Sequence, residues 1–96
     1  MTVTSLGSNE WYNLYYYTYI LKSTKDGGYY YGHCGNIEKG LQAHNAGKVR
    51  STKSRRPFII YYTERFLTKS EAAKREYFFK TIDGYNYLRS SGIIVI

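Results

Sequence analysis

Cysteine, proline and long apolar runs are scarce in this chain of 96 residues. Its one cysteine, Cys34, excludes an internal disulfide and a zinc site built from several cysteines. No run approaches the roughly 20 apolar residues of a membrane-spanning helix. The opening residues, MTVTSLGSNE, lack the basic and apolar stretches of a signal peptide. We therefore expect a cytoplasmic protein with a reduced thiol.

Acidic residues are also few: seven of them stand against 14 lysines and arginines, which gives a net charge of +7. Such an excess on a small body attracts polyanions through its long-range field and through the release of counterions. The alternative is a basic protein without a polyanionic partner. Tyrosine, by contrast, is plentiful, with 13 residues. Most of these should belong to the core and the sheet, because the ring buries apolar area while the hydroxyl keeps a hydrogen bond.

The segment YYYTYILKSTKDGGYYYG at residues 15–32 predicts a β-hairpin. Two runs rich in tyrosine and aliphatic residues flank Asp26-Gly27-Gly28, and glycine supplies the positive φ that a tight turn requires. We expect antiparallel strands at Leu14–Lys22 and Gly28–His33. Gly32 stands near the end of the second strand, at a position where another segment or a ligand can approach the backbone closely.

The rest of the chain predicts helices around a third strand. Asn36 is a good N-cap for the first helix, and Gly47 fits the position after its last turn. The near-continuous apolar start of FIIYYTERF predicts a strand covered on both faces. Thr68 and Glu71 form a capping-box pattern for the second helix, which Asp83-Gly84 should break. The predicted segments are a helix at Ile37–Ala46, a strand at Phe58–Phe66, a helix at Lys69–Ile82 and a short helix at Tyr85–Ser91.

This order, strand-strand-helix-strand-helix, is that of an α+β domain with helices flanking a small three-stranded antiparallel sheet. A chain of this length makes one domain. We expect that domain at residues 14–92, after a polar leader at residues 1–13 in which Trp11 and Tyr12 pack on the body. The apolar tail at residues 93–96 should add to the sheet edge or pack against the domain.

Residues 48–56, KVRSTKSRR, predict a basic surface loop closed by Pro57. Lysine, arginine and hydroxyl side chains are usual donors to nucleic-acid phosphates, so we expect this loop to contact a DNA backbone. The alternative is a charged loop that is only solvated. The loop contains no acid and five cations: Lys48, Arg50, Lys53, Arg55 and Arg56.

Glu76 is the most informative single residue of the second predicted helix. On a helical wheel it lies beside Ala72 and Phe79, which should face the body, so its carboxylate points toward a partly apolar surface. An unpaired carboxylate there is costly, and a cation or a metal ion must compensate. The residues leave two alternatives open: a metal site, or a salt bridge to Lys80 or Lys69.

Two tripeptides of the hairpin, Tyr17-Thr18-Tyr19 and Tyr30-Tyr31-Gly32, resemble the paired signature of the GIY-YIG nucleases, especially their small single-domain branch. Further blocks follow in the family's order: Asn36-Ile37-Glu38, Ala43-His44-Asn45, the basic loop, and Ser70–Glu76. The resemblance implies a divalent-metal-dependent endonuclease that hydrolyses DNA with low sequence specificity, in repair or recombination. It extends to the nuclease domain of the excision-repair endonuclease subunit.

The resemblance also implies roles for individual residues. Glu76 falls where the family places a single metal-ligand glutamate, which would hold one Mg²⁺ or Mn²⁺ ion together with waters and phosphate oxygens. Tyr19 and Tyr30 match the signature tyrosines, one of which would activate the attacking water. His44 matches a position that contacts the phosphate or relays a proton, although a lone histidine is more often a packing or surface residue. His33 stands where some relatives carry a lysine, and we expect a lesser role for it.

One departure from the family bears on catalysis. Relatives carry an arginine one turn before the position of His44, where it stabilises charge on the phosphate, and this chain has Gly40 there. Lys39 points about 100° away on the helical wheel and does not replace that cation. Catalysis is then weakened, supported by a cation from the basic loop, or lost in a domain that still binds nucleic acid. A protein-interaction domain with a basic surface is a third class.

Overall fold

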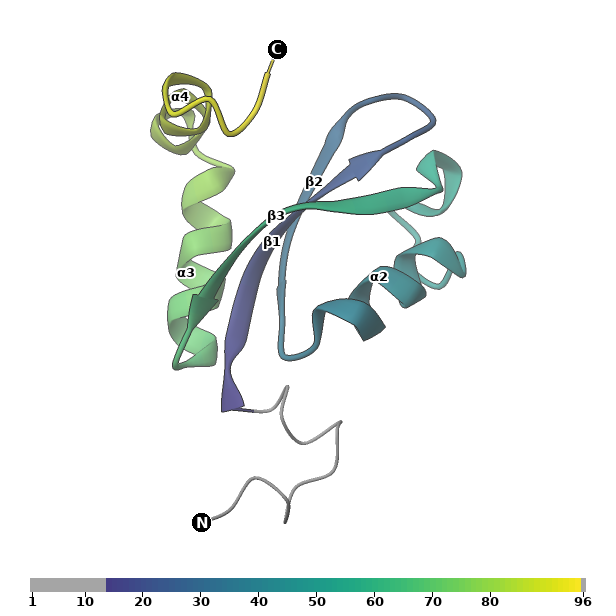
Figure 1. The fold of residues 1–96 in the computed structure, drawn as a ribbon, viewed down its shortest axis with the longest axis horizontal. Helices are drawn as coiled ribbons and strands as arrows, with labels where there is room; N and C mark the ends of the chain where they lie inside the picture. The colour runs from purple at the N-terminus through teal and green to yellow at the C-terminus, as the bar shows by residue number, and fades with distance from the viewer. Residues whose placement is uncertain (1–13, 96) are drawn as a thin grey trace.

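A computed structural model describes residues 14–95 of the chain (Figure 1). Within them, three antiparallel strands form one sheet in the order β2-β1-β3. The predicted α+β class and three-stranded antiparallel sheet are thereby confirmed, while the leader with Trp11 and Tyr12 lies outside the described residues. The elements are β1 Tyr16–Ser23, β2 Tyr29–Cys34, α2 Ile37–Asn45, the 3₁₀ helix η3 Lys53–Arg55, β3 Phe58–Phe66, α3 Lys69–Phe79 and α4 Ile82–Ser90.

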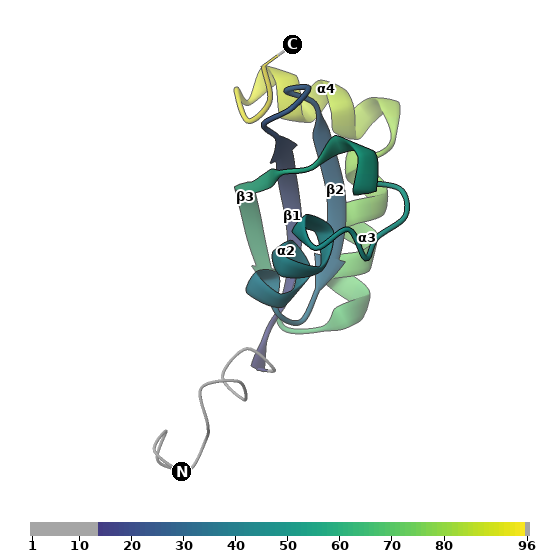
Figure 2. The ribbon, with the colours of Figure 1, turned by 90° about the vertical axis from the view of Figure 1, so that its right-hand side faces the viewer.

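The helices cover opposite faces of the sheet. Figure 2 shows α2 in front of the strands and α3 behind them. Side chains of the central strand β1 alternate between these faces, as the pleat requires. Tyr19 and Leu21 pack with Phe58 on the α2 side, whereas Ile20 packs with Phe79 on the α3 side. The sheet therefore separates two small cores, and β1 contributes to both.

The turn between β1 and β2 forms where the glycines predict it. Gly27 has a φ of 74°, in the left-handed region that glycine tolerates. The Gly27 N–H donates to the Ser23 carbonyl at 2.8 Å, and the Ser23 N–H donates to the Gly28 carbonyl at 2.9 Å. The register that follows from this turn places Tyr19 opposite Gly32.

The predicted caps of α2 and α3 are confirmed. The Asn36 side chain accepts a hydrogen bond from the Lys39 N–H, and Gly47, with a φ of 76°, follows the helix end. The Thr68 hydroxyl oxygen accepts from the Glu71 N–H at 3.1 Å. These contacts satisfy amide groups that the first helical turn leaves without a partner.

The start of β3 is more exposed than its sequence predicts. Ile59 keeps 49% of its surface exposed and Ile60 keeps 39%, so the expectation of a strand covered on both faces is wrong. β3 is an edge strand, and continuous burial falls instead on the central strand β1, over residues 18–21. Position in the sheet, which the composition of a single strand does not encode, decides which strand is covered.

The helix after β3 ends earlier than predicted. α3 stops at Phe79, and the Thr81 side chain begins α4 by accepting a hydrogen bond from the Gly84 N–H at 3.0 Å. Asp83-Gly84 therefore lies in the first turn of α4 and does not break a helix, because the cap at Thr81 outweighs the low helix propensity of glycine. A β-carbon at Gly84 would lie 1.8 Å from the carbonyl oxygen of Phe78, so only glycine lets α4 start this close to α3.

The apolar tail packs against the domain, which is one of the two predicted arrangements. Gly92, with a φ of 74°, ends α4, and the buried Ile94 joins the core cluster of Ile20, Phe79 and Leu88. Residues 93–95 form no strand. The tail therefore completes the core on the α3 side without extending the sheet.

Candidate active site

Tyr19 lies at the centre of the candidate site. It projects from β1 toward α2 and is 6% exposed. A β-carbon at Gly32, its partner on β2, would lie 2.4 Å from the Tyr19 hydroxyl oxygen, so the phenol lies directly over Gly32. Only glycine permits this approach. Because β2 is an edge strand, the hydroxyl of Tyr19 is directed toward the open edge of the sheet.

Helix α2 brings His44 against Tyr19. The Nε2 atom of His44 lies 3.2 Å from the Tyr19 hydroxyl, and its Nδ1 atom lies 2.7 Å from the Thr52 hydroxyl. The Tyr30 ring stands edge-on to the imidazole, with 4.8 Å between the ring centroids. Three of the residues predicted for catalysis, one each from β1, β2 and α2, therefore meet in one group, in which Tyr19 and His44 are buried and Tyr30 is half-buried.

Burial sets the protonation of this group. It raises the pKa of Tyr19 far above the usual value for a phenol, and the nearby Cys34, Tyr30 and Glu76 side chains raise it further. Burial also lowers the pKa of His44. At neutral pH the pair is therefore a neutral phenol hydrogen-bonded to a neutral imidazole. Such a phenol is a poor base by itself, and it can accept a proton only if it passes its own to a neighbour.

Glu76 lies on α3, and both oxygens of its carboxylate have cationic or proton-donating partners. Oε1 lies 2.7 Å from Nδ1 of His33, and Oε2 lies 2.5 Å from Nζ of Lys80. The side chain is 19% exposed. Burial by itself would raise the pKa of Glu76, but the hydrogen bonds from Lys80 and His33 hold it below the usual value. The predicted salt bridge to Lys80 is therefore present in this structure.

Glu76 and Tyr19 are connected only indirectly, through neighbouring residues of the edge strand β2. They lie on opposite faces of the sheet, because α3 covers one face and the Tyr19 side chain the other. At that edge the phenol crosses over Gly32, and the next residue, His33, contacts the Glu76 carboxylate. The negative charge of Glu76 makes the smallest contribution to the raised pKa of Tyr19. Glu76 therefore does not share one cleft with Tyr19 and Tyr30 in the described residues, and the two parts of the candidate site lie on either side of one edge strand.

His33 has a larger part in this arrangement than its sequence position suggested. Its Nδ1 atom holds Glu76, and its side chain lines a surface hollow of about 360 Å³ together with Lys69. The sequence could have indicated this role through the alternation of side chains along a strand. This alternation places His33 on the same face as Tyr31, which packs against Phe79 of α3. A residue on that face is within reach of Glu76, three positions before Phe79 on the same helix.

The basic loop is anchored to the hairpin turn. The Ser23 hydroxyl donates to the Arg55 carbonyl at 2.6 Å, and the Lys25 ammonium donates to the Ser54 carbonyl at 3.0 Å. The Arg55 guanidinium pairs with Asp26 at 2.9 Å. Arg55, one of the five cations predicted to contact phosphate, is therefore committed to an internal partner.

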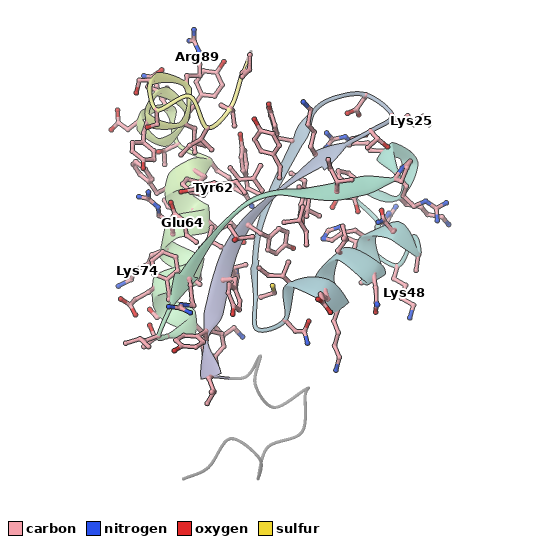
Figure 3. All side chains as sticks on the ribbon, viewed as in Figure 1. Lys25, Lys48, Tyr62, Glu64, Lys74 and Arg89 are labelled. Atoms are coloured by element: carbon pink, nitrogen blue, oxygen red, sulfur yellow. The ribbon has the colours of Figure 1, made fainter. Side chains whose placement is uncertain are left out.

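Other cations of the loop project away from the body. Lys48, Arg50 and Lys53 are exposed, whereas Arg56 is half-buried and donates to the Lys53 carbonyl at 3.0 Å. Lys48 and Lys25 lie at the end of the molecule where α2 finishes and the hairpin turns (Figure 3). Part of the positive charge thus lies in the loop that contains Thr52, the hydrogen-bond partner of His44.

Space beside Gly40 is open. An ideal β-carbon there would lie 3.9 Å from the Cys34 sulfur, an ordinary contact, and, apart from the adjoining Lys39, no cation of the described residues comes within 4 Å of that position. Arg55 is held by Asp26 and does not fill the gap. The nearest atom, the Cys34 sulfur, belongs to the last residue of β2.

A family model for the GIY-YIG catalytic domain matches residues 15–86. The chain belongs to the GIY-YIG family. It is 44% identical over 75 residues to the UPF0213 protein SH2523 of Staphylococcus haemolyticus, covering 77% of this chain and 90% of that protein. It is 47% identical over 75 residues to the UPF0213 protein SSP2268 of Staphylococcus saprophyticus, with the same shares covered. The solution NMR structure of the UPF0213 protein BH0048 from Bacillus halodurans is 32% identical and covers 80% of this chain and 84% of that one, with a TM-score of 0.47.

A GIY-YIG domain indicates an endonuclease-type function and a nucleic-acid substrate. All the residues predicted for the site lie within the matched range. Among residues 14–95, no group of three or more histidine, cysteine, aspartate or glutamate side chains is placed to hold a metal ion. No helix in that same range is long and apolar enough to cross a membrane.

Proposed function

We propose that this GIY-YIG domain is a divalent-metal-dependent endonuclease that hydrolyses phosphodiester bonds of DNA with low sequence specificity. The observation that carries this proposal is the hydrogen bond between the Tyr19 hydroxyl and His44 Nε2, 3.2 Å long, at the open edge of the sheet. A phenol paired with a neutral imidazole supplies the proton transfer that activation of water requires.

Tyr19 is the residue that activates water in this proposal. As the water attacks phosphorus, its proton moves to the Tyr19 oxygen, and the proton that Tyr19 held moves to Nε2 of His44. Tyr19 stays neutral, and the charge formed is an imidazolium. Tyr30 stacks edge-on against the imidazole and keeps it in place. The choice of Tyr19 over Tyr30 rests on the direct hydrogen bond to His44.

Glu76 is the residue that would hold a Mg²⁺ or Mn²⁺ ion. Its carboxylate fits a hard cation that keeps much of its hydration and takes its other ligands from water and substrate phosphate. Each carboxylate oxygen retains a lone pair beyond the one that binds His33 or Lys80, and Lys80 is 50% exposed and free to move aside. Such an ion supplies a Lewis acid and a clamp for the charge that develops on phosphate.

The exposed cations Lys48, Arg50 and Lys53, with Arg56 beside them, are proposed to hold the DNA backbone next to Tyr19. Phosphate contacts of this kind position a duplex without reading its bases, which supports low sequence specificity. Arg55 has a separate role, since its pairing with Asp26 holds the loop in shape.

Gly40 is expected to make this enzyme slow. Removal of one donor that stabilises developing charge lowers the rate by about 100–1000-fold in other enzymes. The open space beside Gly40 supports the view that no other group has taken over this role. A Gly40→Arg variant should therefore be faster than the wild type.

Nicking of supercoiled DNA in Mg²⁺ or Mn²⁺ tests the proposal. We expect slow nicking by the wild type, none by Glu76→Ala and faster nicking by Gly40→Arg. Glu38→Gln is the matched control, because it removes an exposed carboxylate from the first turn of α2 and should leave the rate unchanged. Nicking that survives Glu76→Ala, or that needs no divalent ion, contradicts the proposal.

Gly40 favours one alternative, a nucleic-acid-binding domain that has lost catalysis. In that case the wild type binds DNA in a salt-dependent manner but does not nick it, and activity appears only in Gly40→Arg. The same assay therefore separates the two functions.

A further inference from the structure

We propose that Thr52 is a positioning residue for catalysis. Its hydroxyl holds His44 in the tautomer that carries hydrogen on Nδ1, so that Nε2 is free to take the proton of Tyr19. The catalytic consequence rests on the proposed nuclease function. The tautomer itself is a property of the free protein and can be measured without DNA.

Thr52, His44 and Tyr19 form a continuous series of hydrogen-bond contacts. The Thr52 side chain is completely buried, and its oxygen lies 2.7 Å from His44 Nδ1 and 3.3 Å from the Val49 carbonyl. The Val49 carbonyl can only accept, and in this proposal it takes the single hydroxyl proton of Thr52. The Thr52 oxygen then accepts from Nδ1–H of His44. With hydrogen on Nδ1, Nε2 presents a lone pair to the Tyr19 hydroxyl.

Thr52 also belongs to the basic loop. It is the residue before the helix η3, its N–H donates to the Val49 carbonyl at 3.1 Å, and its carbonyl accepts from the Arg55 N–H at 2.9 Å. Its sequence neighbours include Arg50 and Lys53, two of the cations proposed to hold DNA. One residue therefore links the conformation of the loop to the protonation of the catalytic histidine.

Loss of the Thr52 hydroxyl should reverse the hydrogen bond between Tyr19 and His44. Without an acceptor at Nδ1, the neutral imidazole can carry its hydrogen on Nε2 and donate it to the Tyr19 oxygen. The two residues stay in contact, but Tyr19 no longer has an acceptor for its own proton. Catalysis should fall while DNA affinity is unchanged, because the loop cations are all still present.

NMR of the ¹⁵N-labelled histidines in the free protein tests the tautomer. The chain has two histidines, so the spectrum of a His33→Gln variant assigns the signals of His44. We expect the Nδ1–H form in the wild type and in Thr52→Ser, which keeps the hydroxyl. In Thr52→Val, of similar shape, the Nε2–H form should appear. An Nε2–H form in the wild type, or an unchanged tautomer in Thr52→Val, overturns the proposal.

The nicking assay tests the consequence. Thr52→Val should lose roughly 10–100-fold in rate, the loss typical of removing a partner that orients a functional histidine, and Thr52→Ser should restore it. Equal rates in Thr52→Val and the wild type, with the tautomer changed, overturn the catalytic part. If the wild type does not nick DNA, the proposed function fails, while the NMR result still decides the role of Thr52 in setting the tautomer.

Discussion

Gly32 and Tyr19 face each other across β2 and β1, and the missing β-carbon of Gly32 is what makes room for the phenol. This contact directs the Tyr19 hydroxyl to the sheet edge and to His44. The site therefore requires glycine at position 32, which belongs to the family signature, because a side chain there would clash with Tyr19.

Gly32→Ala should therefore displace Tyr19. The new methyl group would lie 2.4 Å from the phenol, and overpacking of this kind costs about 1–3 kcal/mol in unfolding free energy. Urea unfolding measures the loss, and the His44 tautomer and the nicking rate should change with it. Gly35→Ala is the control, because its β-carbon would have 3.9 Å to the nearest atom, on Tyr16. Equal stability of the two variants would show that Tyr19 is not confined by Gly32.

Arg75 should be a major contributor to stability on the α3 side. It makes a two-pronged salt bridge to Glu64, at 2.7 Å and 3.2 Å, and its guanidinium lies about 5 Å from the rings of Phe78, Phe79 and Tyr87. Because the pair is only partly exposed, we expect Arg75→Ala to lower the free energy of unfolding by about 2 kcal/mol, which is less than the loss for a fully buried pair. Thermal unfolding measures this loss. Lys74→Ala, at an exposed neighbour on the same helix, should change stability little. Similar losses in both would contradict this role.

Because Asp26 pairs with Arg55, the free energy of unfolding should depend on pH in the acid range. The hydrogen bond from Arg55 lowers the pKa of Asp26 to about 2, so between about pH 4 and 2 the unfolded state binds more protons than the folded state. The stabilisation is complete above pH 4 and is lost as the pH falls through that range. Melting temperatures of wild type and Asp26→Asn should therefore differ at pH 5 and converge near pH 2. A constant difference would contradict the pairing.

The basic loop should account for much of the salt dependence of DNA binding. Each phosphate contact contributes about 0.9 to the slope of log affinity against log salt. Lys48→Ala, Arg50→Ala and Lys53→Ala should each reduce that slope by about one contact, with no loss of stability. Lys74→Ala, on α3, is the charge-matched control and should leave the slope unchanged. A slope that is the same in all four variants would place the DNA on another surface.

The titration of His44 should report its burial. Because burial lowers the pKa of His44, its NMR titration midpoint should lie below the ordinary value of about 6.5. The unfolded chain then binds a proton before the folded one, so stability falls as the pH drops from about 6.5 to the midpoint of His44. His44→Gln should flatten this part of the stability curve. A midpoint above 6.5 would exclude the buried, neutral imidazole that the proton transfer requires.

Local signals in the sequence were enough for the boundaries of several elements. Asp26-Gly27-Gly28 predicted the turn, Asn36 and Thr68 predicted the helix starts, and β3 runs over Phe58–Phe66 as its composition indicated. Turns, caps and strand composition depend on contacts within a few residues, which is why one sequence can show them. The end of α3 was harder, because the cap at Thr81 competed with the glycine at position 84.

In the candidate site, too, some residues could be named from the sequence and others only from the structure. Tyr19, Tyr30 and His44 could be named from the signature tripeptides and their spacing, and the structure brings them into one group. The contact of Thr52 with His44 and the pairing of Arg55 with Asp26 left no pattern in the sequence. Both depend on contacts between segments that are separate in the chain, such as the loop against α2 and against the hairpin turn.

The sequence by itself determined the local conformations, the positive charge and the family to which the chain belongs. Only the tertiary structure decided that β1 is the central strand, that Ile59 and Ile60 are exposed, and that Glu76 contacts His33. The physical reason is that strand order and helix placement depend on the packing of both cores together. Side chains far apart in sequence become neighbours only after that packing is complete.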